Sequence, residues 1–190
     1  AVDYFTKWVE AEPLTTITTI RVITFVVKNI IYLFGIPKVI ITDNGTQFDH
    51  TEFQDFCRKY HIEKRYTSVA HPQSNGQVEA ANKMIKSILK KRLKRDKDMW
   101  VDELPLALWA NRTTYKSATG HTPVSLAFGV EAVIPVELEV PSHRTIYYDS
   151  MTNNKLLLES LDMVEEKRDE ANLRALRHKQ QIARYYNRRV

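Results

Sequence analysis

One cysteine, five glycines and seven prolines among 190 residues already leave several classes of protein out. The single Cys57 excludes an intramolecular disulfide framework and a zinc site built from several cysteines, and it is typical of a reducing compartment. With 43% hydrophobic residues, the chain is not collagen-like, low in complexity or disordered. No apolar run approaches the about 18 residues of a membrane span and no signal peptide is visible, so no membrane partner is expected.

The length is enough for one large domain, or for one domain with an appendage, and for a core that needs no disulfides. The sequence begins without methionine, inside a predicted strand that contains Val2, Asp3 and Tyr4. We therefore expect a piece of a longer protein in which the first strand is cut short.

Hydrophobic periodicity predicts alternating strands and helices. Capping boxes are expected to open two of the helices, at Thr51 and at Ser74. The predicted elements are a hairpin or paired strands in 1–12, a helix in 18–34, a buried strand in 38–42, a helix from 51, a strand in 62–68, a loop in 70–73, a long helix from 74 to about 97, a helix in 100–114, an irregular segment in 118–141 and a long helix in 151–190. This order predicts an α/β fold with a mixed sheet.

Three carboxylates lie where α/β proteins place chemistry. Asp3 falls within the first predicted strand, Asp43 follows the buried strand, and Glu79 falls in the first turns of the long helix. Carboxylate oxygens without Cys or His ligands suit Mg²⁺ or Mn²⁺. Two such ions about 3.5–4 Å apart can activate a water or hydroxyl and stabilise the leaving oxygen of a phosphodiester.

Each carboxylate also has a purely structural interpretation. Asp43 precedes Asn44 and Gly45, a common turn sequence. Glu79 near a helix start is favoured by the helix dipole, and Asp3 could lie on an exposed strand face. From spacing alone, this interpretation is the stronger one.

Positive charge is concentrated in one segment of this basic chain, whose net charge is +5. Residues 77–98 hold eight Lys and Arg against three Asp and Glu, an excess equal to that of the whole chain. Steps of three and four residues place six side chains on one face of the predicted helix: Glu79, Lys83, Lys86, Lys90, Lys94 and Lys97. This stripe predicts phosphate contacts leading away from the carboxylates, the alternative being a solvated helix face.

Three polar residues near the start of that helix are further candidates for DNA contact. Gln73 and Asn75, expected in the loop before the helix, could bond bases or phosphates, or could simply make a turn. Asn82, one helical turn beyond Glu79, could orient the site or lie on the surface.

Three separated motifs resemble the catalytic core of retroviral-type integrases. They are VDYFTKW in residues 2–8, ITDNGTQF in 41–48 and HPQSNGQVE in 71–79, and 35 residues separate Asp43 from Glu79. A fourth stretch, TGHTPVSLAFG in residues 119–129, is also similar to that family. The best match is with gypsy-type long terminal repeat retrotransposon polyproteins of plants, members of the DDE family.

The resemblance implies a ribonuclease H-like fold with Asp3, Asp43 and Glu79 as a triad that binds Mg²⁺ or Mn²⁺. It implies trimming of element DNA 3′ ends and their transfer into target DNA, and it matches Lys83 and Lys86 to lysines that contact DNA ends. It divides the chain into a catalytic core in residues 1–140 and a helical linker in 141–190. It also implies a homo-oligomer that acts in the nucleus or in a cytoplasmic virus-like particle.

Two other functions remain open at this point. A non-catalytic remnant would bind DNA through the lysine stripe and would not need Asp43. A ribonuclease H-type nuclease would use the same chemistry on an RNA–DNA hybrid, although nothing in the sequence indicates hybrid recognition.

Overall fold

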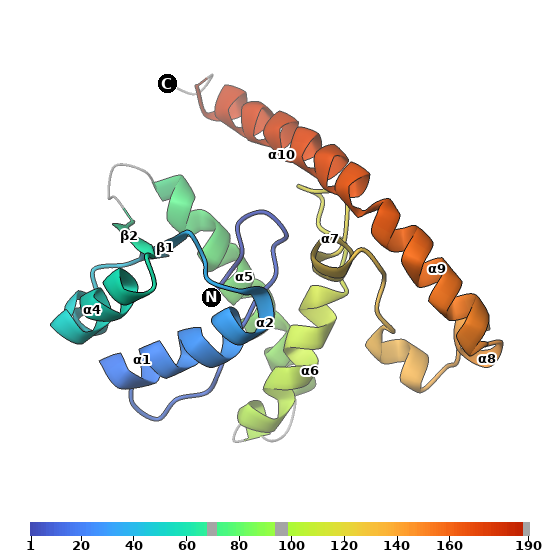
Figure 1. Cartoon of the computed structure of the whole chain (residues 1–190), viewed down its shortest axis with the longest axis horizontal. Helices are drawn as coiled ribbons and strands as arrows, with labels where there is room; N and C mark the ends of the chain where they lie inside the picture. Colours follow the sequence, from blue (N-terminus) through green and yellow to red (C-terminus); the bar gives the residue numbers. More distant parts are fainter. Residues whose placement is uncertain (68–71, 94–98, 188–190) are drawn as a thin grey trace. The chain divides into compact units, whose positions relative to one another are not determined.

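The computed structural model describes residues 1–67, 72–93 and 99–187 (Figure 1). Contacts between Cα atoms divide the chain into two compact units. The first unit consists of residue 1 and residues 10–83, and the second consists of residues 2–9 and 84–190. Asp43 and Glu79 belong to the first unit and Asp3 to the second.

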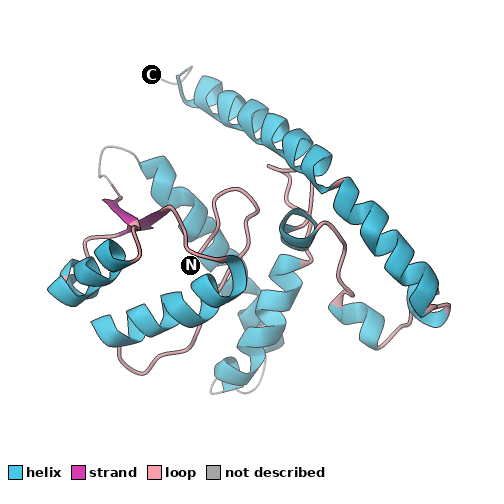
Figure 2. Cartoon of the chain, viewed as in Figure 1, coloured by secondary structure: helices cyan, strands magenta, loops and turns pink. Residues whose placement is uncertain are grey.

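The first unit packs short helices against a pair of parallel strands (Figure 2). Within the described residues the sheet is β1–β2 alone, with Val39 opposite Glu63 and Thr42 opposite Tyr66. The strands predicted in 38–42 and 62–68 are therefore confirmed. The elements in chain order are α1 (Thr19–Val26), the π-helix η1 (Val27–Ile31), α2 (Tyr32–Phe34), β1 (Val39–Thr42), α3 (Thr46–Asp49), α4 (Thr51–Lys59), β2 (Glu63–Tyr66) and the start of α5 (Pro72–Arg92).

The core of the first unit lies between α1 and α4. Phe53, Phe56 and Cys57 of α4 are buried against Val22 and Val26 of α1. Burial in this core raises the pKa of the Cys57 thiol. The apolar residues of these helices recur at helical spacing, which favours helix formation. Thr18 caps the start of α1, because its hydroxyl accepts a hydrogen bond from the backbone N–H of Arg21.

The described part of the second unit is mainly helical, and it includes a loop at the start of the chain. Residues 2–9 form that loop, closed by a single antiparallel bridge between Val2 and Val9. The elements are the end of α5, α6 (Trp100–Arg112), α7 (Pro123–Phe128), the 3₁₀ helix η3 (Pro135–Leu138), α8 (His143–Ile146), α9 (Ser150–Asp162) and α10 (Val164–Asn187). No helix in the described ranges is long and apolar enough to cross a membrane.

Cationic side chains hold α10 against α7. Lys167 Nζ donates to the carbonyl oxygen of Gly129 (2.9 Å). The Arg168 guanidinium donates to the carbonyl oxygens of Leu126 (3.1 Å) and Ala127 (3.3 Å). These oxygens lie at the C-terminal end of α7, where helix carbonyls have no partner within the helix. Ala171 of α10 is fully buried.

Two expectations about strands and sheets differ from the structure. The antiparallel pairing predicted in residues 1–12 is limited to the bridge between Val2 and Val9, and Asp3 lies outside any strand, beside a turn that its hydrogen bonds with Thr6 stabilise. The described sheet accordingly has two parallel strands and lacks the antiparallel strand that a mixed sheet requires.

Helix boundaries also differ from those expected. Helix α4 has His50 as its N-cap with no side-chain hydrogen bond, so Thr51 forms no capping box. Helix α5 begins at Pro72, a residue whose fixed φ suits a first helical position, so Ser74 opens no helix. Residues 118–141 contain α7, and the long C-terminal helix is divided at Met163 into α9 and α10.

Candidate active site

The carboxylate of Asp43 lies directly after β1, at the start of a short connection to α4. Asp43 Oδ1 accepts a hydrogen bond from the backbone N–H of Gly45 (3.1 Å), which shapes the turn before α3. The side chain is exposed, whereas that of the preceding Thr42 is buried. The Thr42 hydroxyl has no hydrogen-bond partner within the described part of the chain. Asp43 follows a strand as predicted, but the strand is not buried, because Val39 and Ile40 are half-buried and Ile41 is 37% exposed.

Asp3 shapes the loop of residues 2–9 in the second unit. Its Oδ2 accepts hydrogen bonds from the backbone N–H (2.7 Å) and the hydroxyl (2.6 Å) of Thr6. The loop is fixed to α6 by Arg112, whose guanidinium donates to the carbonyl oxygen of Val9 and lies 4.4 Å from the Trp8 ring. Asp3 is thus held on a defined loop and not within a strand.

A second cation lies near Lys7 of this loop. Burial lowers the pKa of Lys7, and the ammonium of Lys179 on α10 lowers it further, while Asp3 acts in the opposite direction. Lys7 also adopts a left-handed backbone conformation, with φ of 64°.

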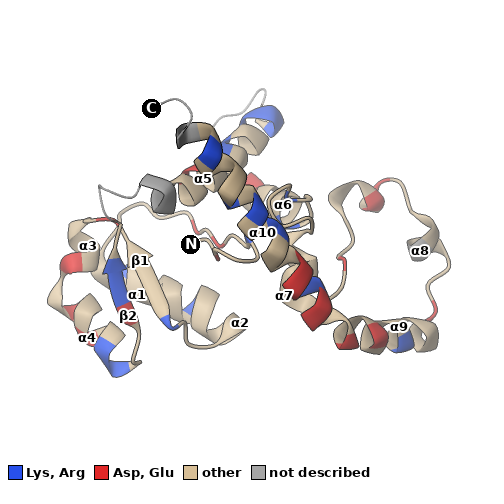
Figure 3. Cartoon of the chain, turned by 90° about the horizontal axis from the view of Figure 1, so that it is seen from above, with Lys and Arg blue, Asp and Glu red and all other residues tan. Residues whose placement is uncertain are grey.

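Glu79 and the predicted DNA-contact residues lie on α5. The side chains of Glu79, Asn82, Lys83, Lys86 and Lys90 are all exposed on this continuous helix, and its basic C-terminal half is visible in Figure 3. Within the described ranges, Lys83, Lys86 and Lys90 have no ion pair that offsets their charge. Lys94 and Lys97 of the predicted stripe lie outside the described residues.

The expected loop position of Gln73 and Asn75 is wrong. Both residues belong to the first turns of α5, which begins at Pro72. Their side chains, and residues 70 and 71 of the expected loop, lie outside the described part of the structure.

The described residues contain no ready-made cluster of metal ligands. Within residues 1–67, 72–93 and 99–187, no group of three or more His, Cys, Asp or Glu side chains could hold a metal ion. The chemistry of the donors nevertheless fits a hard cation, because Asp3, Asp43 and Glu79 offer only carboxylate oxygens.

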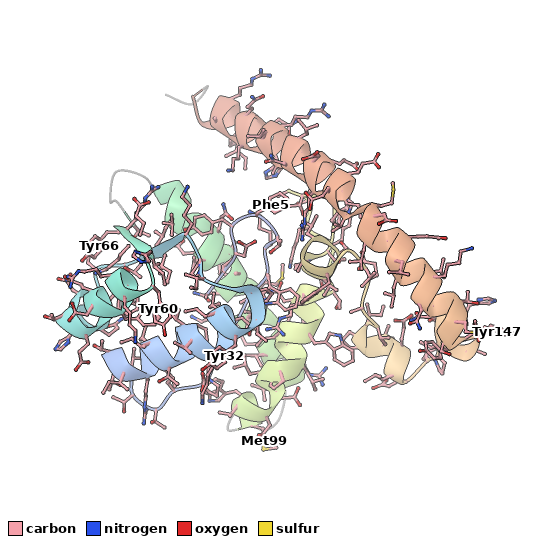
Figure 4. All side chains as sticks on the ribbon, in the orientation of Figure 1. Phe5, Tyr32, Tyr60, Tyr66, Met99 and Tyr147 are labelled. Carbon is pink, nitrogen blue, oxygen red and sulfur yellow. The ribbon has the colours of Figure 1, made fainter. Side chains whose placement is uncertain are left out.

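A network around Lys64 was not predicted from the sequence. Lys64 Nζ, on β2, donates to the carbonyl oxygen of Phe48 (2.5 Å) and to the hydroxyl of Tyr66 (2.6 Å). The Tyr66 hydroxyl in turn donates to Asp49, which lowers the pKa of that carboxyl. Tyr66 is labelled in Figure 4. Lys64 is paired with Ile40 in the sheet, so its side chain points to the same inward face as that of Ile40. A lysine at an inward-facing position was the signal that could have indicated this network.

A second buried cation lies in the other unit. Lys116 Nζ donates to the side-chain oxygen of the buried Asn111, and burial lowers the pKa of Lys116 to about 8. The side-chain nitrogen of Asn111 has no hydrogen-bond partner in the described residues.

The chain is similar to integrase catalytic cores and to the polyproteins that contain them. The family profile described as "Integrase core domain" matches residues 1–72. The Gag-Pol polyprotein of woolly monkey sarcoma virus is 38% identical over 129 residues, which are 67% of this chain and 8% of the polyprotein. The transposon Tf2-3 polyprotein of Schizosaccharomyces pombe is 30% identical over 146 residues, or 76% of this chain and 11% of that polyprotein.

Among solved structures, the HTLV-2 integrase catalytic core domain in complex with magnesium, in its trimeric form, aligns with a TM-score of 0.56. It is 30% identical, and the alignment covers 66% of this chain and 80% of that core. The fold class predicted from the sequence, a ribonuclease H-like α/β core, is confirmed by this likeness. The present chain spans about a tenth of the two polyproteins it matches.

Proposed function

Because the chain belongs to the family of retroviral-type integrase catalytic cores, we propose that it performs the polynucleotidyl transfer step of DNA integration. The proposed reaction trims the 3′ ends of element DNA and joins them to target DNA. The observation that carries this proposal is the presence of Asp3, Asp43 and Glu79 in order, each within a motif of the family and with 35 residues between the last two.

In this proposal, Asp3, Asp43 and Glu79 hold Mg²⁺ or Mn²⁺ through their carboxylate oxygens. A pair of such ions supplies an activated water or hydroxyl and stabilises the leaving oxygen of the phosphodiester. The exposed carboxylates of Asp43 and Glu79 are accessible to metal and substrate, and the Thr6 hydrogen bonds keep the Asp3 carboxylate in one orientation. The magnesium complex of the HTLV-2 core supports this choice of ion.

Helix α5 is the proposed DNA surface. Lys83, Lys86 and Lys90 present three exposed ammonium groups that would contact phosphates, starting one turn from Glu79. We assign Asn82 to the same contact because it is exposed on this helix. Gln73 and Asn75, in the first turns of α5, complete the proposed set.

The origin and organisation of the parent protein are also proposals. The four sequence motifs favour a gypsy-type retrotransposon of a plant host, and the likeness to the Tf2-3 transposon polyprotein supports a transposon as the parent element. Residues 1–140 would form the catalytic core and 141–190 a helical linker. The protein would act as a homo-oligomer on DNA, in the nucleus or in a virus-like particle, in keeping with the trimeric form of the HTLV-2 core.

The test is a nicking and strand-joining assay on labelled branched DNA with Mg²⁺ or Mn²⁺. The proposal predicts that Asp43→Asn abolishes metal-dependent joining and leaves the fold intact, because an amide neither carries the charge nor bridges cations as a carboxylate does. The matched control is Asp55→Asn on α4, an exposed aspartate paired only with Arg58 among described residues. Joining that persists in Asp43→Asn removes Asp43 from the site.

A second candidate is a non-catalytic DNA-binding module, which the exposed lysines of α5 support. Such a module would bind DNA through the lysines of α5 and would be indifferent to Asp43→Asn. A folded chain that binds DNA but neither nicks nor joins it, with either metal, would favour this candidate over the transferase.

A further inference from the structure

The side chain of Lys64 is almost fully enclosed although it carries a charge. Only 11% of it is exposed. Its Nζ donates to the Phe48 carbonyl and to the Tyr66 hydroxyl, lies 3.5 Å from an Asp49 carboxylate oxygen, and lies 4.2 Å from the centre of the Tyr66 ring. A cation in such surroundings is stable only while these partners remain, because it has lost most of its hydration.

Among the described residues, the Lys64 ammonium has its hydrogen-bond and ion-pair partners outside β2 in the segment that begins at Asp43, and it also lies 6.0 Å from the centre of the Phe53 ring on α4. Phe48 and Asp49 are the last two residues of α3. The N-cap of α3 is Gly45, whose backbone N–H donates to the Asp43 carboxylate. Lys64 therefore fixes one end of a short segment whose other end carries the proposed metal ligand.

Helix α3 cannot hold that segment by itself. It has four residues, about one turn, and Gly45 provides no side-chain cap. A single turn is far below the about 12 residues at which an isolated helix becomes stable in water. Its position depends on tertiary contacts, which include the Lys64 network, the hydrogen bond from Gln54 Nε2 to the Asp49 carbonyl oxygen (2.9 Å) and the packing of the Phe48 ring 5.6 Å from Phe53.

We propose that Lys64 is a positioning residue for Asp43, acting through the Phe48 carbonyl and Asp49 to set where the Asp43 carboxylate is presented. This inference rests on the proposed role of Asp43 as a metal ligand. Mutation of a residue that orients a metal ligand without touching the ion typically lowers metal affinity by about 10- to 100-fold.

The neighbouring residue on β2 supplies a matched control. Arg65 also carries one positive charge, but it lies on the opposite face of the strand, is exposed, and pairs with Glu63 (2.8 Å). Arg65→Gln removes a charge next to Lys64 and leaves the segment from Asp43 to Asp49 untouched.

The experiment measures Mn²⁺ binding by calorimetry, with the metal alone, and amide hydrogen exchange by NMR. It uses the full chain and the variants Lys64→Met, Lys64→Arg and Arg65→Gln. We expect Lys64→Met to weaken Mn²⁺ binding about tenfold and to accelerate exchange of the α3 amides of Phe48 and His50. Lys64→Arg should recover part of both effects, and Arg65→Gln should match the wild type.

Equal Mn²⁺ affinity in Lys64→Met and Arg65→Gln, or unchanged exchange at Phe48 and His50, would overturn the inference. Should Lys64→Met fail to fold, Tyr66→Phe tests the branch of the network through the Tyr66 hydroxyl, which accepts from Lys64 and donates to Asp49, while the hydrogen bond from Lys64 to Phe48 stays. An unchanged Mn²⁺ affinity in Tyr66→Phe then counts against Lys64.

Failure of the proposed function gives a different result. If Asp43→Asn leaves Mn²⁺ binding unchanged, Asp43 is not a metal ligand. The proposed metal site is then wrong, whether or not Lys64 holds the segment in place. The exchange measurement does not involve metal, so it reports separately on whether Lys64 holds the segment.

Discussion

Replacing Lys86 by glutamine should reduce the salt dependence of DNA binding by a predictable amount. Lys83, Lys86 and Lys90 are exposed on α5, so each can neutralise one phosphate. Each such contact releases counterions and contributes about −0.9 to the slope of log K against log salt concentration on duplex DNA. Three contacts give a slope of about −2.7, and the two that remain in Lys86→Gln give about −1.8.

The two slopes predict clearly different losses of DNA affinity when the salt concentration is raised. Raising salt from about 50 to about 200 mM should weaken wild-type binding about 40-fold and Lys86→Gln binding about 12-fold. Fluorescence anisotropy with a labelled duplex at four or five salt concentrations measures both slopes. The control is Lys59→Gln, an exposed lysine on α4 that makes the same change in net charge away from α5.

A slope for Lys86→Gln equal to that of the wild type would refute the reasoning, because a lysine that contacts a phosphate must release counterions. An equal flattening in Lys59→Gln would also refute it, since the effect would then follow net charge and not the α5 surface.

Two further predictions concern the second unit. Arg168→Met keeps the alkyl stem but removes two hydrogen bonds to the last turn of α7. The free energy of unfolding, measured by urea titration, should therefore fall by about 2 kcal/mol. The control is Arg177→Met, which replaces an exposed arginine of α10 and should change this free energy little, and equal losses in the two variants would contradict the anchoring role. Because burial lowers the pKa of Lys116 to about 8 in the folded chain, from an ordinary value near 10.5, the unfolded chain binds more protons between these values and stability should rise with pH there. Lys116→Met should flatten that rise in unfolding midpoints measured from pH 7 to 10.5, and an unchanged slope would contradict the assignment.

Local patterns predicted much of the first unit. The apolar spacing of residues 18–34 indicated a helix, and the structure has one there, with a π-helical stretch at Val27–Ile31. The β-branched run in residues 38–42 indicated β1, and Asp43 follows it as expected. Such signals are strong because side-chain periodicity depends only on the geometry of the element itself.

Side-chain hydrogen bonds account for what the patterns missed near Asp3. Two hydrogen bonds from Thr6 to the Asp3 carboxylate favour a turn over an extended strand, and strand propensity depends on neighbours that a sequence does not specify.

Helix α7 was not predicted, although the sequence contains the residues that usually start and end a helix. Thr122 caps it, Pro123 is its first residue and Gly129 follows its end with φ of 79°, which is the usual order of start and stop residues in a short helix. The number of prolines in 118–141 obscured that order.

The Lys64 network had no local signal of comparable strength. It joins β2 to Phe48 and Asp49, residues 15 or 16 positions earlier, and only the parallel register of β1 and β2 brings them together. Long-range contacts of this kind follow from the packed fold, not from the spacing of residues.

The central claim is that Asp3, Asp43 and Glu79 bind the same metal ions, and Mn²⁺ titration followed by NMR tests it most directly. Paramagnetic Mn²⁺ broadens the signals of nuclei close to it. The account predicts that amide signals adjacent to all three carboxylates broaden together at the same low Mn²⁺ concentration, and that Asp43→Asn removes all three effects. Broadening confined to one of the three segments, or unchanged in Asp43→Asn, would contradict it.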